Sequence, residues 1–235
     1  MGDLLWYVAN VATKFDLDLD SIAENNLEKC RNRWGWRNAA ETNASSLNPS
    51  FDSEFPETER LPRNFKVEFT EVTQDNSVRM RAFIEGEQVG NELTDNSYSS
   101  DGYRFHDVFH LSYAAILGWS PVTRQILGRR KRKSNPRVDE VEDGGRAKAI
   151  EEGISALVFS YTKDHAFLEG VTTLDYRLLK TLKSMTSHLE VAQCSLGDWE
   201  KAILMGYEVW RQVEKNRGGT VVVDLDAHSI TYQLS

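Results

Sequence analysis

The sequence predicts an α+β fold that is mainly helical and has a small antiparallel β-sheet. Apolar residues recur at spacings of three and four along several long segments, which is typical of amphipathic or buried helices. Two short segments alternate apolar and polar residues instead, which is typical of half-buried strands. The chain has 235 residues, enough for one or two domains with a sizeable core.

The first expected helix covers residues 3–15 and is apolar almost all the way round, from Leu4 to Phe15. A helix of this kind normally lies inside a bundle. It carries Asp3 at its tip and stands at the beginning of the chain. The sequence therefore raises the question of which segment covers this helix.

A second helix is expected over about 21–33. Its apolar residues follow a spacing of three and four: Ala23, Leu27, Cys30 and Trp34. Residues 37–63 are rich in Asn, Ser, Pro and acidic residues and show no periodicity, so we interpret them as a linker or an extended segment. The expected organisation is a helical hairpin over 1–36, this linker, and an α+β domain over 64–235.

The expected C-terminal domain opens with a β-hairpin. Residues 65–69 alternate strictly, residues 77–84 form a second strand, and Gln74-Asp75-Asn76 suits the turn between them. A second hairpin is expected near the end of the chain, with strands at 221–223 and 230–232. Between the two hairpins, helices are expected at four places: 103–117, 144–161, 174–189 and 197–216.

Composition narrows the range of partners. The net charge of -8 argues against a general affinity for nucleic acid, because the phosphate backbone is bound through a surplus of Lys and Arg. The opening apolar run is too short to span a bilayer and lacks the basic region of a signal peptide. Cys30 and Cys194 suit a reducing compartment. We therefore expect a cytoplasmic protein that binds neither membranes nor nucleic acid.

Two histidines are the first candidates for catalytic or metal-binding residues. His106 and His110 stand four residues apart on the expected helix over 103–117, and therefore on one face of it. The rest of that helix is apolar nearly all round, so both imidazoles should be buried. A His pair with this spacing is a good geometry for binding a metal ion. The pattern differs from HExxH, because Asp107 occupies the second position.

A carboxylate on the helix over 144–161 is the expected partner of these histidines. On a helical wheel Glu151 lies at the edge of the apolar face, whereas Glu152 points the other way. A buried carboxylate needs a partner, which a histidine, Arg104 or a metal ion would supply. A structural His–Glu network without metal and a catalytic transition-metal site both remain open. The catalytic and metal-binding candidates are His106, His110 and Glu151.

Residues 129–133 form one strong basic run, Arg-Arg-Lys-Arg-Lys, within a charged loop expected over 128–142. A solvated loop is the commonest explanation of such a run. An acidic cluster follows at once, so a loop that folds on itself is a further expectation; the cluster consists of Asp139, Glu140, Glu142 and Asp143. The functional alternative is a mobile clamp for an anionic ligand beside the histidine helix. Given the net negative charge of the chain, a nucleotide polyphosphate would suit that clamp better than DNA.

The helix over 21–33 presents Asn26, Lys29 and Arg33 on one face, a set of donors that suits phosphate oxygens, although a solvated face is the alternative. These residues follow Gly2-Asp3-Leu4-Leu5-Trp6-Tyr7 and Asp18-Leu19-Asp20-Ser21-Ile22-Ala23. The ordered set, over residues 2–34, resembles the MazG-type nucleoside triphosphate pyrophosphohydrolases.

The resemblance implies an all-α, usually dimeric enzyme that hydrolyses a nucleoside triphosphate (NTP) to the monophosphate and pyrophosphate, with Mg²⁺ held by carboxylates. Asp3 matches the final Asp of the family's ExxD metal motif. Asn26 and Lys29 match positions that face the nucleotide, and Arg33 follows them on the same face. The implied partners are a nucleotide and a second copy of the chain.

The EExxE carboxylates of that family would lie before Met1. A hard cation such as Mg²⁺ needs several oxygen ligands, so we interpret the helical hairpin as a remnant and expect an upstream pyrophosphohydrolase half. Residues from about 60 onward also look like the domain that follows the MazG module in some longer bacterial proteins, notably at 103–110 and at Gly118-Trp119-Ser120-Pro121. This domain is then either a non-catalytic regulatory or assembly module or a separate metal-dependent phosphohydrolase.

Overall fold

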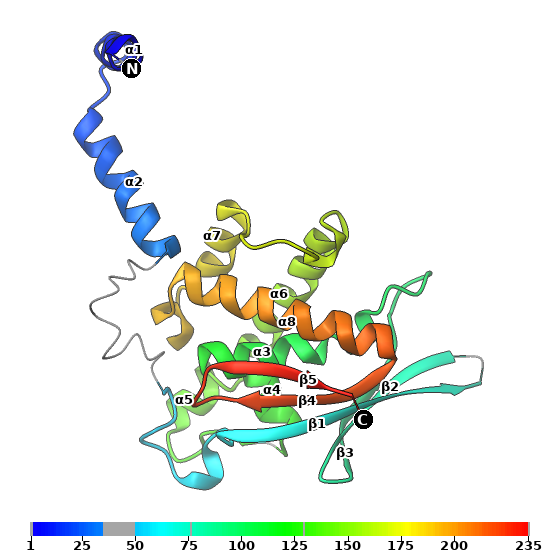
Figure 1. The fold of residues 1–235 in the computed structure, drawn as a ribbon. Coiled ribbons are helices and arrows are strands. Elements are labelled where there is room, and N and C mark those ends of the chain that lie inside the picture. Colours follow the sequence, from blue (N-terminus) through cyan, green and yellow to red (C-terminus); the bar gives the residue numbers. More distant parts are fainter. Residues whose placement is uncertain (1, 35–49, 76, 129, 235) are drawn as a thin grey trace. The chain divides into compact units, whose positions relative to one another are not determined.

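The computed structural model describes residues 2–34, 50–75, 77–128 and 130–234 (Figure 1). The chain forms two compact units, Met1–Ala44 and Ser45–Ser235. The boundary between them falls inside the segment over 37–63 that the sequence suggests is a linker.

The first unit contains the two helices that the sequence predicts, α1 (Gly2–Lys14) and α2 (Leu19–Trp34). The apolar side chains of α1 are exposed within it, and Trp6, for example, is 62% exposed. Among the residues of this unit whose side chains the structure describes, Ala12 alone is buried. The contacts within the unit therefore leave the apolar surface of α1 uncovered.

The second unit contains a five-stranded antiparallel sheet in the order β3-β2-β1-β4-β5 (Figure 1). Its strands are β1 (Asn64–Gln74), β2 (Ser77–Ile84), β3 (Glu87–Leu93), β4 (Gly218–Asp224) and β5 (Ser229–Gln233). The two predicted hairpins are confirmed, and β1 pairs with β4 to join them into one sheet. The all-α fold implied by the resemblance is therefore wrong for the chain as a whole.

Strand β3 is absent from the sequence prediction because its residues are mostly polar and alternate weakly. It lies at an edge of the sheet, and Glu92 ties it to β2 by accepting hydrogen bonds from Arg79 Nη1 at 3.1 Å and Arg81 Nε at 2.7 Å. Cross-strand ion pairs of this kind stabilise a strand that has little apolar surface to bury.

The helices of the second unit are α3 (Asp107–Leu117), α4 (Pro121–Ile126), α5 (Pro136–Val141), α6 (Gly145–Lys163), α7 (Tyr176–Met185) and α8 (Leu196–Asn216). Every residue of α3 is buried, as its apolar sequence predicts. Helices α3 and α8 pack against each other and against β4 and β5 (Figure 1). Their approach is close, because a Cβ atom added at Gly206 would lie 3.0 Å from Ser112 Cβ.

Two short helices begin at proline residues that follow a capping residue. Ser120 Oγ accepts from Thr123 N at the start of α4, and Asn135 Oδ1 accepts from Val138 N at the start of α5. Helix α5 lies within the stretch that the sequence suggests is a charged loop. In the described part of the chain, no helix is both long enough and apolar enough to cross a membrane.

The segment over 50–63 belongs to the second unit and is held there by Asp52. The Asp52 carboxylate accepts hydrogen bonds from Leu61 N at 2.8 Å, Arg124 Nη2 at 2.8 Å and Arg63 Nη2 at 2.9 Å. Burial favours the neutral acid, but these donors outweigh it and hold the pKa of Asp52 below its ordinary value.

Replacing Asp52 by asparagine is expected to lower the free energy of unfolding by about 1.5–3 kcal/mol at neutral pH. Because the pKa of Asp52 is lowered in the folded state, its contribution is present above its ordinary pKa of 3.8 and is lost as the pH falls further. Urea unfolding at pH 7 and pH 3 checks both points. An equal difference between wild type and Asp52→Asn at the two pH values would contradict this account.

Candidate metal centre

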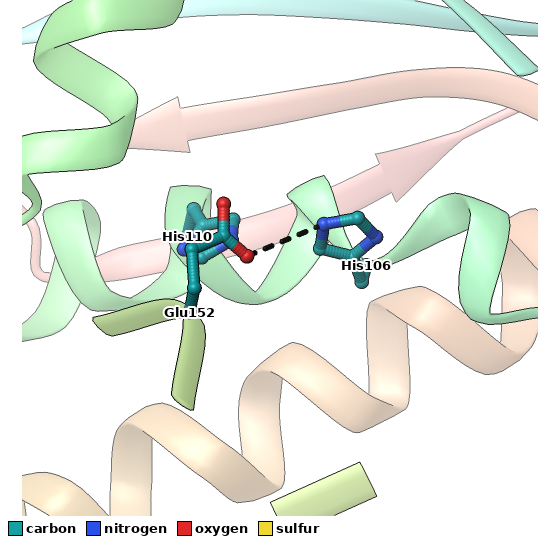
Figure 2. A group of neighbouring side chains, drawn as sticks. All are labelled: His106, His110 and Glu152. Carbon is teal, nitrogen blue, oxygen red and sulfur yellow. Dashed lines mark ion pairs between the residues drawn. The ribbon is translucent and has the colours of Figure 1, made fainter. Parts of the chain in front are cut away.

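Three side chains from α3 and α6 converge in the second unit. His106 is the residue that precedes α3, His110 lies one turn further along, and Glu152 comes from α6 (Figure 2). Glu152 Oε2 lies 3.6 Å from His106 Nε2 and 3.4 Å from His110 Nε2. One donor atom from each of the three residues lies within 4.8 Å of the other two.

The orientation of both imidazoles is fixed by hydrogen bonds on their far sides. His110 Nδ1 contacts Glu151 Oε1 at 2.8 Å, and His106 Nδ1 contacts the Tyr103 carbonyl oxygen at 2.9 Å. A carbonyl oxygen only accepts, so Nδ1 of His106 carries the proton. The ring of Tyr103 also stacks on that of His106, with 4.4 Å between centroids. Partners of this kind are typical of metal-binding histidines, whose Nε2 atoms are then free to coordinate.

Glu151 is a buried partner of His110, as the sequence suggests, but it is not one of the three converging donors. It is fully buried, and besides His110 its carboxylate accepts hydrogen bonds from Ser120 Oγ at 2.6 Å and Val122 N at 2.9 Å. Glu151 therefore orients His110 instead of joining the three converging donors. The expectation that Glu152 points away is wrong, because its long side chain reaches back to both histidines.

Asp107 is a further acid at this site that the sequence reasoning missed. It is buried, and Asp107 Oδ1 lies 3.9 Å from His106 Nε2. Burial raises the pKa of the Asp107 carboxyl. The only signals for Asp107 and Glu152 in the sequence are that each directly follows a candidate residue, which does not distinguish them from solvated neighbours.

The electrostatics of the site centre on His110. Burial by itself would lower the pKa of His110, but the carboxylates of Glu151 and Glu152 outweigh burial and raise it to about 10. Burial likewise opposes ionisation of Glu152, yet the two histidines lower the pKa of its carboxyl well below the usual range. A proton and a metal ion therefore compete for His110 Nε2.

A structural His–Glu network without metal gives each ring nitrogen of His110 a carboxylate neighbour: Nδ1 lies 2.8 Å from Glu151 Oε1, and Nε2 lies 3.4 Å from Glu152 Oε2. His110 Nε2 is buried, and its ion pair with Glu152 Oε2 lacks hydrogen-bond geometry, so among the described residues this nitrogen has no hydrogen-bond partner. A buried polar atom without such a partner is unusual and calls for an explanation. A metal ion held by His106, His110 and Glu152 would supply a ligand bond to this nitrogen.

The donor set indicates which ions fit. Two imidazole nitrogens and one carboxylate oxygen suit Zn²⁺, Mn²⁺, Fe²⁺, Co²⁺ or Ni²⁺. Mg²⁺ prefers oxygen ligands, so the ion implied by the resemblance does not fit this site. Three protein ligands leave a coordination position for water, as in catalytic zinc sites. The side chain of Glu152 is 47% exposed, so the site opens to solvent on that side.

The remaining predicted site residues are not among the three converging donors. Asp3 and Asn26 are exposed on α1 and α2 in the first unit. The side chains of Lys29 and Arg33 lie outside the described residues. Arg104 is not the partner of Glu151, because it pairs with Glu71 and Asp95.

The basic run also differs from its expected form. Arg132 is buried and pairs with Asp143 and Glu190, and Arg130 donates to the carbonyl oxygen of Arg60. These contacts tie Arg130 and Arg132 to the core and to the segment over 50–63. The expectation of a mobile clamp beside the histidine helix is corrected accordingly.

Comparison with known proteins gives one match. The family model described as MazG C-terminal domain matches residues 46–235. No curated protein and no solved structure matches the chain.

Proposed function

The chain belongs to the MazG C-terminal domain family, and from this premise we propose that its second unit binds one divalent transition-metal ion and uses it to hydrolyse a nucleotide phosphate. The observation that carries the proposal is the convergence of His106 Nε2, His110 Nε2 and Glu152 Oε2 within 4.8 Å. The buried Nε2 of His110, whose 3.4 Å ion pair with Glu152 Oε2 lacks hydrogen-bond geometry, supports it.

Each residue around the site has a defined part in this proposal. His106, His110 and Glu152 would hold the ion, and Glu151 keeps Nε2 of His110 directed at it. A bound ion of this class lowers the pKa of a coordinated water and polarises a phosphoryl oxygen. The exposed side of Glu152 is where a substrate phosphate would enter.

Glu152→Gln and His106→Gln are expected to weaken Zn²⁺ or Mn²⁺ binding by more than roughly 100-fold. Mutation of a residue that only hydrogen-bonds to a metal ligand typically lowers metal affinity 10–100-fold, and loss of the ligand itself should lower it further. Isothermal titration calorimetry and the metal content of the purified chain measure this effect. The matched control is Glu208→Gln, which removes an exposed carboxylate of α8. Wild-type affinity in both ligand variants would exclude the centre.

Hydrolysis is tested by measuring phosphate and pyrophosphate release from a panel of NTPs and dNTPs with Zn²⁺, Mn²⁺ or Mg²⁺. The proposal expects release that His106→Gln abolishes and Asp3→Ala leaves unchanged. Stoichiometric metal binding without release from any nucleotide would contradict the hydrolytic part. It would favour a regulatory or assembly module instead.

Pyrophosphate release from NTPs by the first unit is the second candidate function. The resemblance of residues 2–34 and the family match over the rest of the chain support it. Asp3 supplies a single carboxylate, and Mg²⁺ needs several oxygen ligands, so this candidate requires further ligands besides Asp3. Release abolished by Asp3→Ala but not by His106→Gln would favour this candidate.

Two further proposals concern the oligomeric partner of the chain and its location in the cell. The family's usual dimerisation makes a second copy of the chain a proposed partner. Cys30 and Cys194 are free thiols, which supports a cytoplasmic location.

A further inference from the structure

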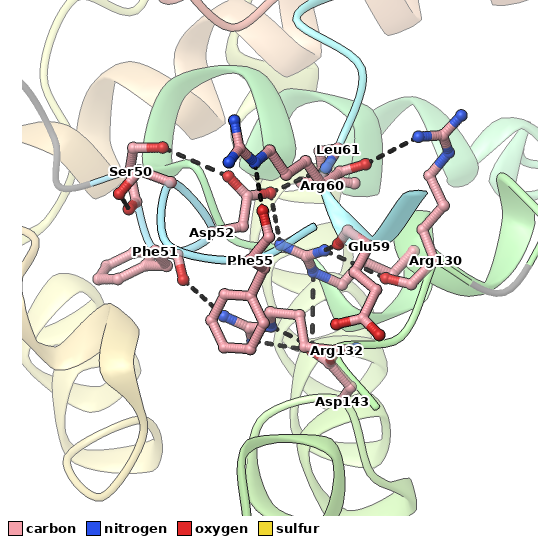
Figure 3. A network of polar contacts seen from close by, with 12 residues as sticks. Ser50, Phe51, Asp52, Phe55, Glu59, Arg60, Leu61, Arg130, Arg132 and Asp143 are labelled. Carbon is pink, nitrogen blue, oxygen red and sulfur yellow. Dashed lines mark hydrogen bonds and ion pairs between the residues drawn. The ribbon is translucent and has the colours of Figure 1, made fainter. Parts of the chain in front are cut away.

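Asp107 is an exception among the buried carboxylates of this protein. In the part of the chain that the structure describes, every other buried carboxylate accepts at least one hydrogen bond from an N–H group: Asp52, Asp143, Glu151 and Glu200. Figure 3 shows two of these acids, Asp52 and Asp143, within a network of arginine side chains. Asp107 is 8% exposed, and its carboxylate accepts no hydrogen bond from a described residue. A buried polar group without such a partner calls for an explanation.

The carboxylate of Asp107 faces an atom that also lacks a donor. Asp107 is the first residue of α3, where the helix dipole favours a negative charge. Its Oδ1 lies 3.9 Å from His106 Nε2, which is too long for a hydrogen bond. Because His106 Nδ1 donates to the carbonyl oxygen of Tyr103, Nε2 of the neutral ring carries a lone pair. Two acceptor atoms therefore lie close together at the edge of the metal centre.

The position of Asp107 fits a partner that is bound to the ion better than it fits the ion itself. Asp107 is not one of the three residues whose donor atoms all lie within 4.8 Å of one another. The charges of those residues nevertheless act on its carboxyl group; they are His106, His110 and Glu152. An ion with three protein ligands keeps a coordination position for water. A hydrogen bond of about 2.7 Å from that water extends beyond the ligand atoms, toward a carboxylate beside His106.

We propose that Asp107 is a positioning residue, which accepts a hydrogen bond from the water molecule bound to the ion at the metal centre. This inference rests on the proposed function, because it requires an ion at His106, His110 and Glu152. The hydrogen bond would fix the orientation of the water, so that a lone pair of its oxygen is directed at the substrate. Asp107 also favours water over an anion in this coordination position. An anion without a proton cannot donate to the carboxylate and is repelled by its charge.

Azide binding to the full chain loaded with Co²⁺ tests the proposal, because the visible absorption of Co²⁺ changes when an anion replaces its bound water. Asp107→Asn removes the negative charge and supplies an amide N–H that can donate to azide. This variant is expected to bind azide roughly tenfold or more tightly than wild type, the range for hydrogen bonds to charged groups. Asp107→Ala removes the charge alone and is expected to show a smaller gain. Damage to the fold would not increase the affinity for azide, and circular dichroism verifies that each variant is folded.

The matched control is Asp164→Asn, which removes the same group from an exposed position at the C-terminal end of α6 and is expected to bind azide as wild type does. An equal gain in this control would overturn the proposal, because it would show a general effect of charge. Unchanged or weaker azide binding by Asp107→Asn would also overturn it.

Titration with Co²⁺ separates this inference from the proposed function. Asp107→Asn is expected to weaken Co²⁺ binding by less than roughly 100-fold, as for a residue outside the ligand set. A larger loss would show that Asp107 is itself a ligand and would overturn the proposal while leaving the metal centre in place. If wild type binds no Co²⁺, the metal centre is wrong and this inference is wrong with it.

Discussion

Replacing Glu151 by alanine is expected to lower the free energy of unfolding by about 3–5 kcal/mol, the range for breaking a buried charged network from one side. The Glu151 carboxylate is fully buried and satisfies His110 Nδ1, Ser120 Oγ and Val122 N. Its removal leaves a buried imidazole and two other donors without an acceptor. Urea unfolding followed by circular dichroism measures the loss.

The adjacent Glu152 provides the matched comparison. Glu152→Ala removes the same chemical group from a half-exposed position, so it is expected to cost less than half as much. Glu151→Gln keeps an oxygen acceptor and should be more stable than Glu151→Ala. In Glu151→Gln the pKa of His110 is expected to fall from about 10, because one of the two carboxylates that raise it is gone. Equal losses for Glu151→Ala and Glu152→Ala would show that Glu151 is not the structural partner of His110.

Arg132→Ala is expected to have an effect of similar size, a loss of about 3–5 kcal/mol. The Arg132 side chain is 1% exposed, and its Nη2 lies 2.8 Å from Asp143 Oδ1 and 2.7 Å from Glu190 Oε1. Truncation leaves both carboxylates without this partner, and Asp143 is itself fully buried. Equilibrium unfolding in urea measures the change.

Two further variants test whether the buried ion pairs of Arg132 cause this loss of stability. Arg132→Lys is expected to recover only part of it, because an ammonium group cannot form two-pronged hydrogen bonds with both acids. Arg137→Ala removes an exposed arginine whose ion pair with Glu140 is on the surface, and it should cost less than about 1 kcal/mol. A comparable loss for Arg132→Ala and Arg137→Ala would mean that burial of the pair contributes nothing.

Several features of this protein follow from local sequence pattern. The period of apolar residues predicts α1, α3, α6 and α8, and strict alternation over 65–69 predicts β1, because one face or the whole of each element must be buried. The spacing of His106 and His110 places both rings on one face of α3 for the same reason. The family relation was also visible in residues such as those at 103–110, and the match over 46–235 confirms it.

Other features depended on contacts between distant parts of the chain. How α6 packs on α3 decides which ring nitrogens each acid meets: Glu151 contacts Nδ1 of His110, whereas Glu152 faces the Nε2 atoms of both histidines. The acidic cluster after the basic run indicates a loop that folds on itself, and Arg132 does pair with Asp143 of that cluster. Its second partner, Glu190, comes from a distant segment that the run does not reveal. Sequence periodicity determines which face of an element is apolar, whereas the pairing of charges requires tertiary structure, because it depends on distances between residues far apart in the chain.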